Sequence, residues 1–147
     1  MHTEHLQNVR YGWVIAGWLV AIAVVSLVVF VFEASGFVEG GGPRDALASL
    51  IAVVAGFAAG GFFAGFRALE APILHGIGIG LTSLVAWVVV NLVATALLDV
   101  VGWQSVTPAF AVGLVLVQVV AAVVGALLGF NVATRGKPGL TEGDSPG

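Results

Sequence analysis

Residues 56–80, GFAAGGFFAGFRALEAPILHGIGIG, decide the fold of this 147-residue chain. Two very hydrophobic segments meet here across a short turn that contains Arg67, Glu70 and Pro72. Glycine is frequent on both sides of the turn. In water so many glycines would destabilise a helix, whereas in a bilayer they allow two helix backbones to approach closely. The stretch therefore predicts two closely packed membrane-spanning helices.

The composition of the whole chain agrees with a membrane location. Hydrophobic residues make up 59% of the sequence, charged residues make up 9%, and the mean hydropathy is +1.09. A soluble domain carries about 25% charged residues, so this chain cannot cover a globular surface in water. The net charge of −3 argues against a nucleic-acid partner. The absence of cysteine excludes disulfides, thiolate metal sites and a cysteine nucleophile.

Four apolar segments flank the central turn and the loops. They cover residues 12–32, 46–66, 72–98 and 108–133, and each has the length of about 20 residues that a transmembrane helix needs. We therefore predict an all-α integral membrane bundle of four transmembrane helices, forming one domain over 12–133. Residues 1–11 form a short polar lead, and the tail 134–147 is predicted to be disordered because it is rich in Gly, Pro and charge. Asp45 is expected to cap the second helix.

The basic residues predict the orientation. Arg10, Arg67, Arg135 and Lys137 fall on one side of the membrane if the chain crosses it four times, and Arg44 falls on the other. Because Lys and Arg favour the cytoplasmic side, we expect a multi-pass protein of the cell membrane with both termini in the cytoplasm.

Small residues define the predicted helix contacts. On the second helix, the glycines lie on one half and Phe62, Phe63 and Phe66 on the other, so we expect the glycines to meet another helix and the phenylalanines to meet lipid. We expect hairpins of helices one with two and three with four, and a close glycine contact between helices two and three. The predicted packing residues are Gly56, Gly60, Gly61, Gly65, Gly76, Gly80, Gly125 and Gly129.

A short motif occurs twice. Gly61-x-x-x-Gly65-Phe66 in the second helix matches Gly125-x-x-x-Gly129-Phe130 in the fourth. This match predicts two similar helical hairpins related by an axis along the membrane normal, as in parallel transporter repeats. The alternative is that GxxxG is simply common in apolar helices.

Few polar residues lie within the spans, and none of them is Asp, Glu, Lys or Arg. The candidate polar contacts are His75, Glu70, Arg67, Trp87, Asn91 and Gln118. We expect the Gln118 amide to hydrogen-bond the Trp87 indole or Asn91 and so to join helices three and four; the alternative is a polar pore lining. We expect His75 to bond Glu70 or the backbone of the turn, the alternatives being a sensor of cytoplasmic pH and a phosphate or partner contact.

One part of the sequence resembles a known family. The run Gly60-Gly61-x-x-Ala64-Gly65-x-Arg67-Ala68, followed by Leu74-His75-Gly76 and Gly80, looks like the YrzE-like small bacterial membrane proteins. The resemblance covers helices two and three. It implies a four-helix membrane protein of unknown function, acting as an accessory or stress-linked component.

Three classes of function are compatible with this pattern. The first is a non-enzymatic structural or accessory module that associates with itself or with a larger membrane complex through glycine-rich packing. The second is a small oligomeric transporter or channel. The third, an intramembrane enzyme, is disfavoured because no acid, base or nucleophile constellation is visible. We expect no catalytic residue, cofactor or metal site, and no nucleic-acid partner; the lipid bilayer is the expected environment.

Overall fold

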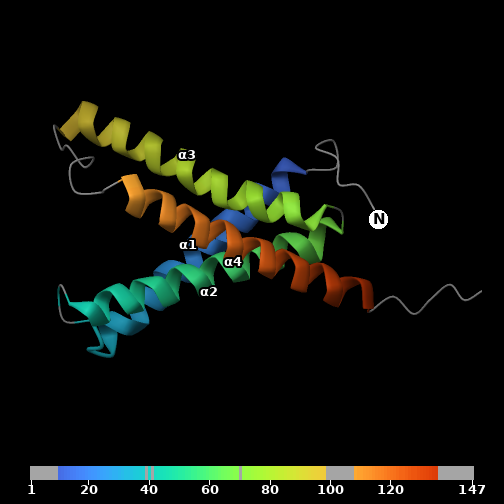
Figure 1. The fold of residues 1–147 in the computed structure, drawn as a ribbon, viewed down its shortest axis with the longest axis horizontal. Helices are drawn as coiled ribbons and strands as arrows, with labels where there is room; N and C mark the ends of the chain where they lie inside the picture. Colours follow the sequence, from blue (N-terminus) through green and yellow to red (C-terminus); the bar gives the residue numbers. More distant parts are fainter. Residues whose placement is uncertain (1–9, 39, 41, 70, 99–107, 136–147) are drawn as a thin grey trace, which may run out of the picture.

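The computed structural model describes residues 10–38, 40, 42–69, 71–98 and 108–135. In these residues the chain forms four α-helices and no strand (Figure 1). They are α1 (Tyr11–Ala34), α2 (Pro43–Ala68), α3 (Pro72–Leu98) and α4 (Pro108–Arg135). All four are long and apolar enough to cross a membrane. The predicted all-α, four-span architecture is therefore confirmed.

The helix boundaries differ little from the predicted spans. The third helix begins and ends at the predicted residues 72 and 98, and the fourth begins at the predicted residue 108 and ends two residues later than predicted. The first and second helices extend one to three residues beyond the predicted limits at each end. The polar lead is helical from Tyr11 onwards. Residues 1–9 and 136–147 lie outside the described residues, so the predicted disorder of the tail stays a prediction there.

The start of α2 shows why this helix begins earlier than predicted. Pro43 occupies the first helical position, where the missing N–H of proline costs nothing. The carboxylate of Asp45 then accepts the backbone N–H of Gly42 at 3.2 Å. Asp45 thus stabilises the helix start as predicted, but from the third position inside the helix rather than from the position before it.

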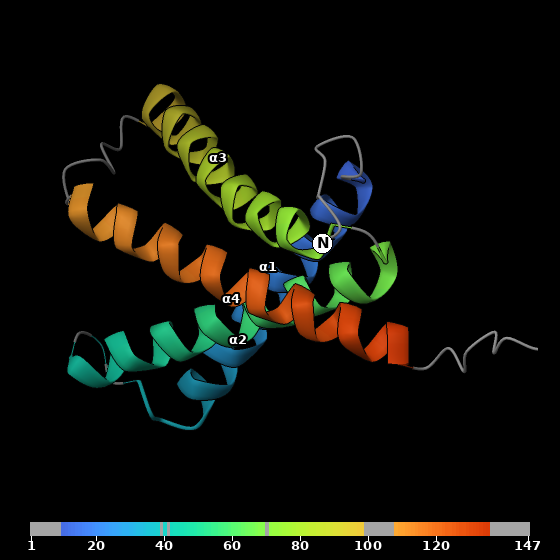
Figure 2. The ribbon, with the colours of Figure 1, turned by 45° about the vertical axis from the view of Figure 1, so that its right-hand side comes forward.

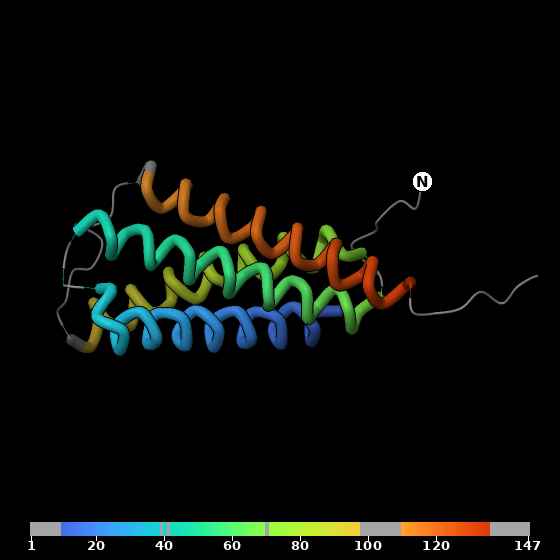
Figure 3. The backbone as a smooth tube through the Cα atoms, turned by 90° about the horizontal axis from the view of Figure 1, so that it is seen from below, coloured from blue at the N-terminus to red at the C-terminus, as the bar shows by residue number. Residues whose placement is uncertain are grey.

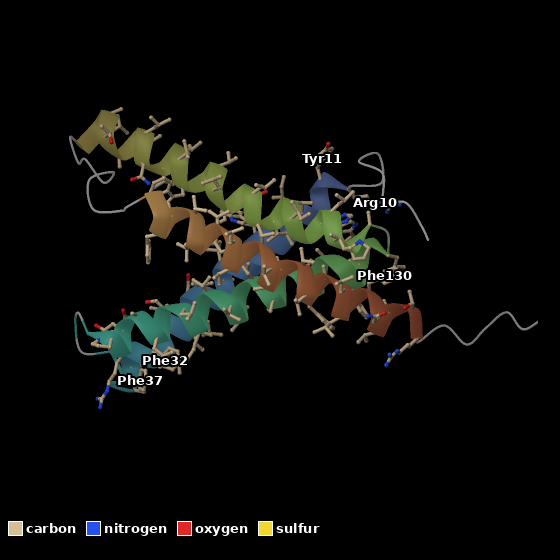
Figure 4. All side chains as sticks on the ribbon, in the orientation of Figure 1. Arg10, Tyr11, Phe32, Phe37 and Phe130 are labelled. Carbon is tan, nitrogen blue, oxygen red and sulfur yellow. The ribbon has the colours of Figure 1, made fainter. Side chains whose placement is uncertain are left out.

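The helices run alternately up and down. The end of the bundle that carries Arg10, Arg67 and Arg135 is called the arginine end; the fourth described arginine, Arg44, lies at the opposite end. Figure 4 shows Arg10 and Tyr11 toward the first of these ends and Phe32 and Phe37 at the other. The distribution of arginines matches the predicted asymmetry.

The core lies toward the arginine end. α2 packs extensively against both α1 and α4, α3 packs mainly against α4, and the α1–α3 and α2–α3 contacts are smaller. Ala21, Phe57, Ala64, Ile79 and Ala122 are fully or almost fully buried there. In contrast, the described side chains of α3 beyond Gly80 and of α4 before Gln118 are at most half-buried. The helices diverge toward the other end, which we call the splayed end (Figures 2 and 3).

Candidate functional site

The closest approach in the bundle is between α2 and α4. A side chain at Gly61 would overlap the carbonyl oxygen of Ala122, and one at Gly125 would overlap that of Ala58. One turn further along, Gly65 faces Ala126 and Gly129 faces Phe62 in the same way. Glycine is required at these four positions because the neighbouring atoms belong to a helix backbone. Cα–H···O=C contacts, which recur at such interfaces, are worth about 0.5–1 kcal/mol each.

The α2–α4 contacts are reciprocal. Gly61 and Gly125 are 64 positions apart, and so are their partners Ala58 and Ala122. The same spacing relates Gly65 to Gly129 and Phe62 to Ala126. Exchanging the two helices therefore reproduces the contact. This is the pattern expected of two parallel helices that are related by a local two-fold axis running along them. This geometry supports the hypothesis of two similar hairpins, and the carbonyl partners Ala58 and Ala122 extend the match beyond the glycines themselves.

The other packing glycines hold the hairpins together. Gly56 and Gly60 of α2 face α1, where Ala21 and Gly17 present backbone oxygens to them. Gly17 in turn faces the carbonyl of Gly60. This pairing of α1 with α2 agrees with the prediction, and Gly17 and Ala21, the two small residues that the first helix offers for packing, both lie at the contact.

The glycines of α3 face α4 rather than α2. Side chains at Gly76 and Gly80 would meet the Cα atoms of Val123 at 2.6 Å and Val119 at 3.0 Å. The predicted glycine contact between the second and third helices is therefore wrong. The physical reason is that α1 and α4 occupy the glycine-bearing half of α2, and α4 also occupies the glycines Gly76 and Gly80 of α3. The contact between α2 and α3 is correspondingly smaller.

The phenylalanines of α2 divide into two groups. Phe62 and Phe66 are exposed on the bundle surface and their rings stack with centroids 6.1 Å apart, as expected for residues that face lipid. Phe63 is half-buried and its ring meets Trp13 of α1 edge-on at 6.0 Å. The expectation that all three face lipid is thus wrong for Phe63, because α1 lies over it.

His75 lies at the arginine end and is completely buried. Its Nε2 atom accepts the backbone N–H of Arg10 at 3.2 Å, and its Nδ1 atom lies 2.9 Å from the carbonyl oxygen of Ala71. Because a backbone N–H can only donate, Nε2 is the acceptor and Nδ1 carries the proton that is donated to Ala71. His75 therefore joins the start of α1 to the start of α3 (Figure 4 labels Arg10 at this point).

The expectation for His75 is confirmed in part. The histidine bonds the backbone of the turn, as predicted, and Ala71 holds its carbonyl there in a left-handed conformation with φ 41°. Arg10 was not foreseen, because its backbone lies 65 residues away in the sequence. The side chain of Arg67 is exposed, and Glu70 lies outside the described residues, so its predicted contact with His75 stays a prediction.

Three polar side chains in the spans bond their own helix. Asn91 donates to the carbonyl of Trp87 at 2.8 Å, Thr82 to that of Gly78 at 2.8 Å and Thr134 to that of Phe130 at 2.9 Å. Each bond runs to the residue four positions earlier, which satisfies the polar group without a second helix. The predicted link from Gln118 to Asn91 is absent from the hydrogen bonds of the described residues, because the Asn91 amide is engaged within α3.

Gln118 and Trp87 nevertheless lie close together. Both line a cavity of about 110 Å³ between the splayed halves of α3 and α4, together with Ser83, Phe110 and Leu114. Gln118 is only 8% exposed, and no hydrogen bond joins its amide to any residue that the structure describes. The prediction that Gln118 and Trp87 share a place between the third and fourth helices is confirmed, whereas the predicted bond from the amide to the Trp87 indole is wrong.

Other site chemistry is sparse in the described part of the chain. Residues 10–38, 40, 42–69, 71–98 and 108–135 contain no group of three or more His, Cys, Asp or Glu side chains placed to hold a metal ion. One enclosed side-chain nitrogen among them, Trp18 Nε1, lacks a hydrogen-bond partner. Comparison with protein-family models, with curated proteins and with solved structures finds no match to this chain.

Proposed function

We propose that this protein is a non-enzymatic structural or accessory module of the membrane. The proposal rests on which helices the packing glycines contact. All eight predicted packing glycines meet another helix of the same chain. The chain is thus a self-contained scaffold whose lipid-facing surface is made of ordinary apolar side chains. A partner helix would therefore dock on those side chains and not on a smooth glycine face.

The polar groups of the spans also support this proposal. Thr82, Asn91 and Thr134 are bonded within their own helices, and His75 is bonded to backbone at both ring nitrogens. Polar groups that carry ions or protons across a membrane normally form a continuous series facing a hydrated space. These four polar groups instead make hydrogen bonds that stabilise the local structure.

We further propose that the arginine end is cytoplasmic and that the host membrane is the cell membrane. Three of the four described arginines, Arg10, Arg67 and Arg135, lie at that end. The positive-inside rule then places both termini in the cytoplasm. The resemblance to the YrzE-like membrane proteins favours the same accessory role.

A second candidate function is a small oligomeric transporter or channel. The reciprocal α2–α4 contact favours it, because many transporters are built from repeats related by an axis along the membrane normal. The cavity beside Gln118 is the place where such a protein would bind a solute. The two functions differ in one measurable property, the passage of solute across a sealed membrane.

The test is a flux assay on the purified chain in liposomes, combined with the mass of the native assembly. The module predicts that permeability to K⁺, H⁺ and glycerol equals that of protein-free liposomes. A conduit predicts protein-dependent flux that scales with the amount of a closed homo-oligomer. Protein-dependent flux abolished by Gln118→Leu, in a variant that keeps the native mass, would refute the module and establish the second function.

A further inference from the structure

The cavity between α3 and α4 contains an unusual polar group. Gln118 lies within a helix whose neighbouring positions are Val and Leu, and its side chain is more than nine-tenths buried. Its amide has two N–H donors and one carbonyl acceptor, and none of them bonds a residue that the structure describes. A buried amide without a partner costs about 1–3 kcal/mol. The cost is removed if a bound molecule supplies the missing partner.

The amide can reach such a molecule. Among the described residues, the one enclosed and unpaired side-chain nitrogen or oxygen atom is Trp18 Nε1, so the Gln118 amide atoms are accessible. Gln118 lines the cavity from α4, and Ser83, which carries a hydroxyl group, lines it from α3. Two polar residues therefore border the same small space from opposite helices.

The walls of the cavity define the chemistry of its occupant. The aromatic rings of Trp87 and Phe110 and the side chain of Leu114 provide an apolar lining, and no charged side chain of the described residues takes part. An ion would be unfavourable there without a countercharge. The volume of about 110 Å³ compares with a cavity of about 150 Å³ that holds benzene. The space therefore fits a six-membered ring that protrudes slightly, or a short length of chain, with one oxygen near the amide.

We propose that this cavity binds the oxygen-bearing end of a neutral amphiphile that enters from the bilayer between α3 and α4. Gln118 donates to, or accepts from, a carbonyl or hydroxyl group of this molecule, and Ser83 provides a second hydrogen bond. Trp87 and Phe110 pack against the ring or chain that carries the oxygen, and the rest of the amphiphile stays in the lipid. A ring ketone such as a quinone and a long-chain alcohol share this chemistry.

Nuclear magnetic resonance of the full-length chain in nanodiscs tests the proposal. The chain has three glutamines, Gln7, Gln104 and Gln118, and Val117-Gln118 is its one Val-Gln pair. Labelling valine carbonyls with ¹³C and glutamine with ¹⁵N therefore identifies the backbone amide of Gln118 without a mutation. The side-chain amide of Gln118 is identified as the signal that is lost in the Gln118→Leu variant. The probes are decyl-benzoquinone, 1-decanol and, as the control that lacks oxygen, decane. The other two glutamines serve as internal controls.

The proposal expects a saturable shift of the Gln118 side-chain amide with an oxygen-bearing probe and no comparable shift with decane. Saturation by the quinone alone identifies a ring as the carrier of the oxygen, and saturation by the alcohol alone identifies a chain. Ser83→Ala should weaken binding about three- to tenfold, the equivalent of one hydrogen bond. The proposal is overturned if neither oxygen-bearing probe shifts Gln118, or if decane shifts it equally.

Discussion

The crossing of α2 and α4 predicts the effect of adding a single methyl group. A Cβ atom at Gly61 would lie 2.7 Å from the carbonyl carbon and 2.8 Å from the Cα atom of Ala122. Carbon atoms pack at about 3.5–4.0 Å, so Gly61→Ala has to move the two helices apart by roughly 1 Å. A flexible side chain cannot absorb the shift, because the obstructing atoms are backbone.

The energetic cost follows from the contacts that the shift weakens. A gap of about 0.5–1 Å forfeits a quarter to a half of the attraction of each atom pair, which is about 0.1–0.2 kcal/mol. With on the order of 20 pairs at the crossing, the loss is about 0.5–2 kcal/mol, which overlaps the range of about 1–3 kcal/mol typical of overpacking. We expect Gly125→Ala to cost the same, because its contact with Ala58 is the reciprocal one.

The double variant is the decisive measurement. One displacement of the helices makes room for both methyl groups, so Gly61→Ala combined with Gly125→Ala should cost about as much as either alone, and not twice as much. The matched control is Gly113→Ala, which is also on α4 but would place its Cβ within 4 Å of no described atom outside its own helix backbone. It should be neutral or stabilising by up to about 1 kcal/mol. Unfolding by sodium dodecyl sulfate in mixed micelles, followed by circular dichroism, gives the free energies. Additive losses, or an equal loss in the control, would show that the two helices do not share one rigid crossing.

Three further predictions concern the packing and the polar groups. His75→Leu removes the acceptor of the Arg10 N–H, whereas the Ala71 carbonyl still accepts the backbone N–H of residue 75. Hydrogen exchange at the first turn of α1 should therefore accelerate about tenfold, equivalent to about 1.4 kcal/mol; unchanged protection there would contradict the link. Gln118→Leu should retain or raise the free energy of unfolding, since it removes a buried amide that bonds no described residue; a loss above about 1 kcal/mol would reveal a structural bond. Gly80→Leu should destabilise the bundle by at least about 2 kcal/mol, because backbone atoms of Val119 obstruct the larger side chain. Phe66→Leu on the exposed face should change the free energy of unfolding by less than about 0.5 kcal/mol. Similar effects of the two substitutions in the same unfolding assay would refute the assignment of the packed and exposed faces.

The sequence was sufficient for the number, the type and nearly the limits of the helices. Apolar length sets these features, and prolines at 43, 72 and 108 mark three helix starts. It was also sufficient to identify which glycines pack, because a residue without a side chain is conspicuous in an apolar helix. The sequence was insufficient to decide which helix each glycine meets. On α2, Gly60 and Gly61 are adjacent yet face α1 and α4 respectively, so a single smooth face serves two neighbours.

The polar contacts were harder to predict for a different reason. A helical Asn or Thr can satisfy itself on the carbonyl four residues earlier, as Asn91 and Thr82 do, and no pattern in the sequence distinguishes this choice from a bond across helices. His75 bonds the backbone N–H of Arg10, and a backbone donor has no residue type to signal it. The cavity beside Gln118 arises from the divergence of α3 and α4, which is a property of helix angles and not of composition.

The divergence of the helices makes the molecule a wedge in the bilayer (Figures 2 and 3). Its cross-section is smaller at the arginine end than at the splayed end, so it displaces less lipid area from one leaflet than from the other. The lateral pressure within the leaflet at the splayed end then acts on the angle between α3 and the neighbouring helices. Lipids that crowd this leaflet press α3 toward its neighbours, and lipids that relax it allow the angle to widen. The spontaneous curvature of the host monolayer is thereby a variable in the conformational energy of this small bundle.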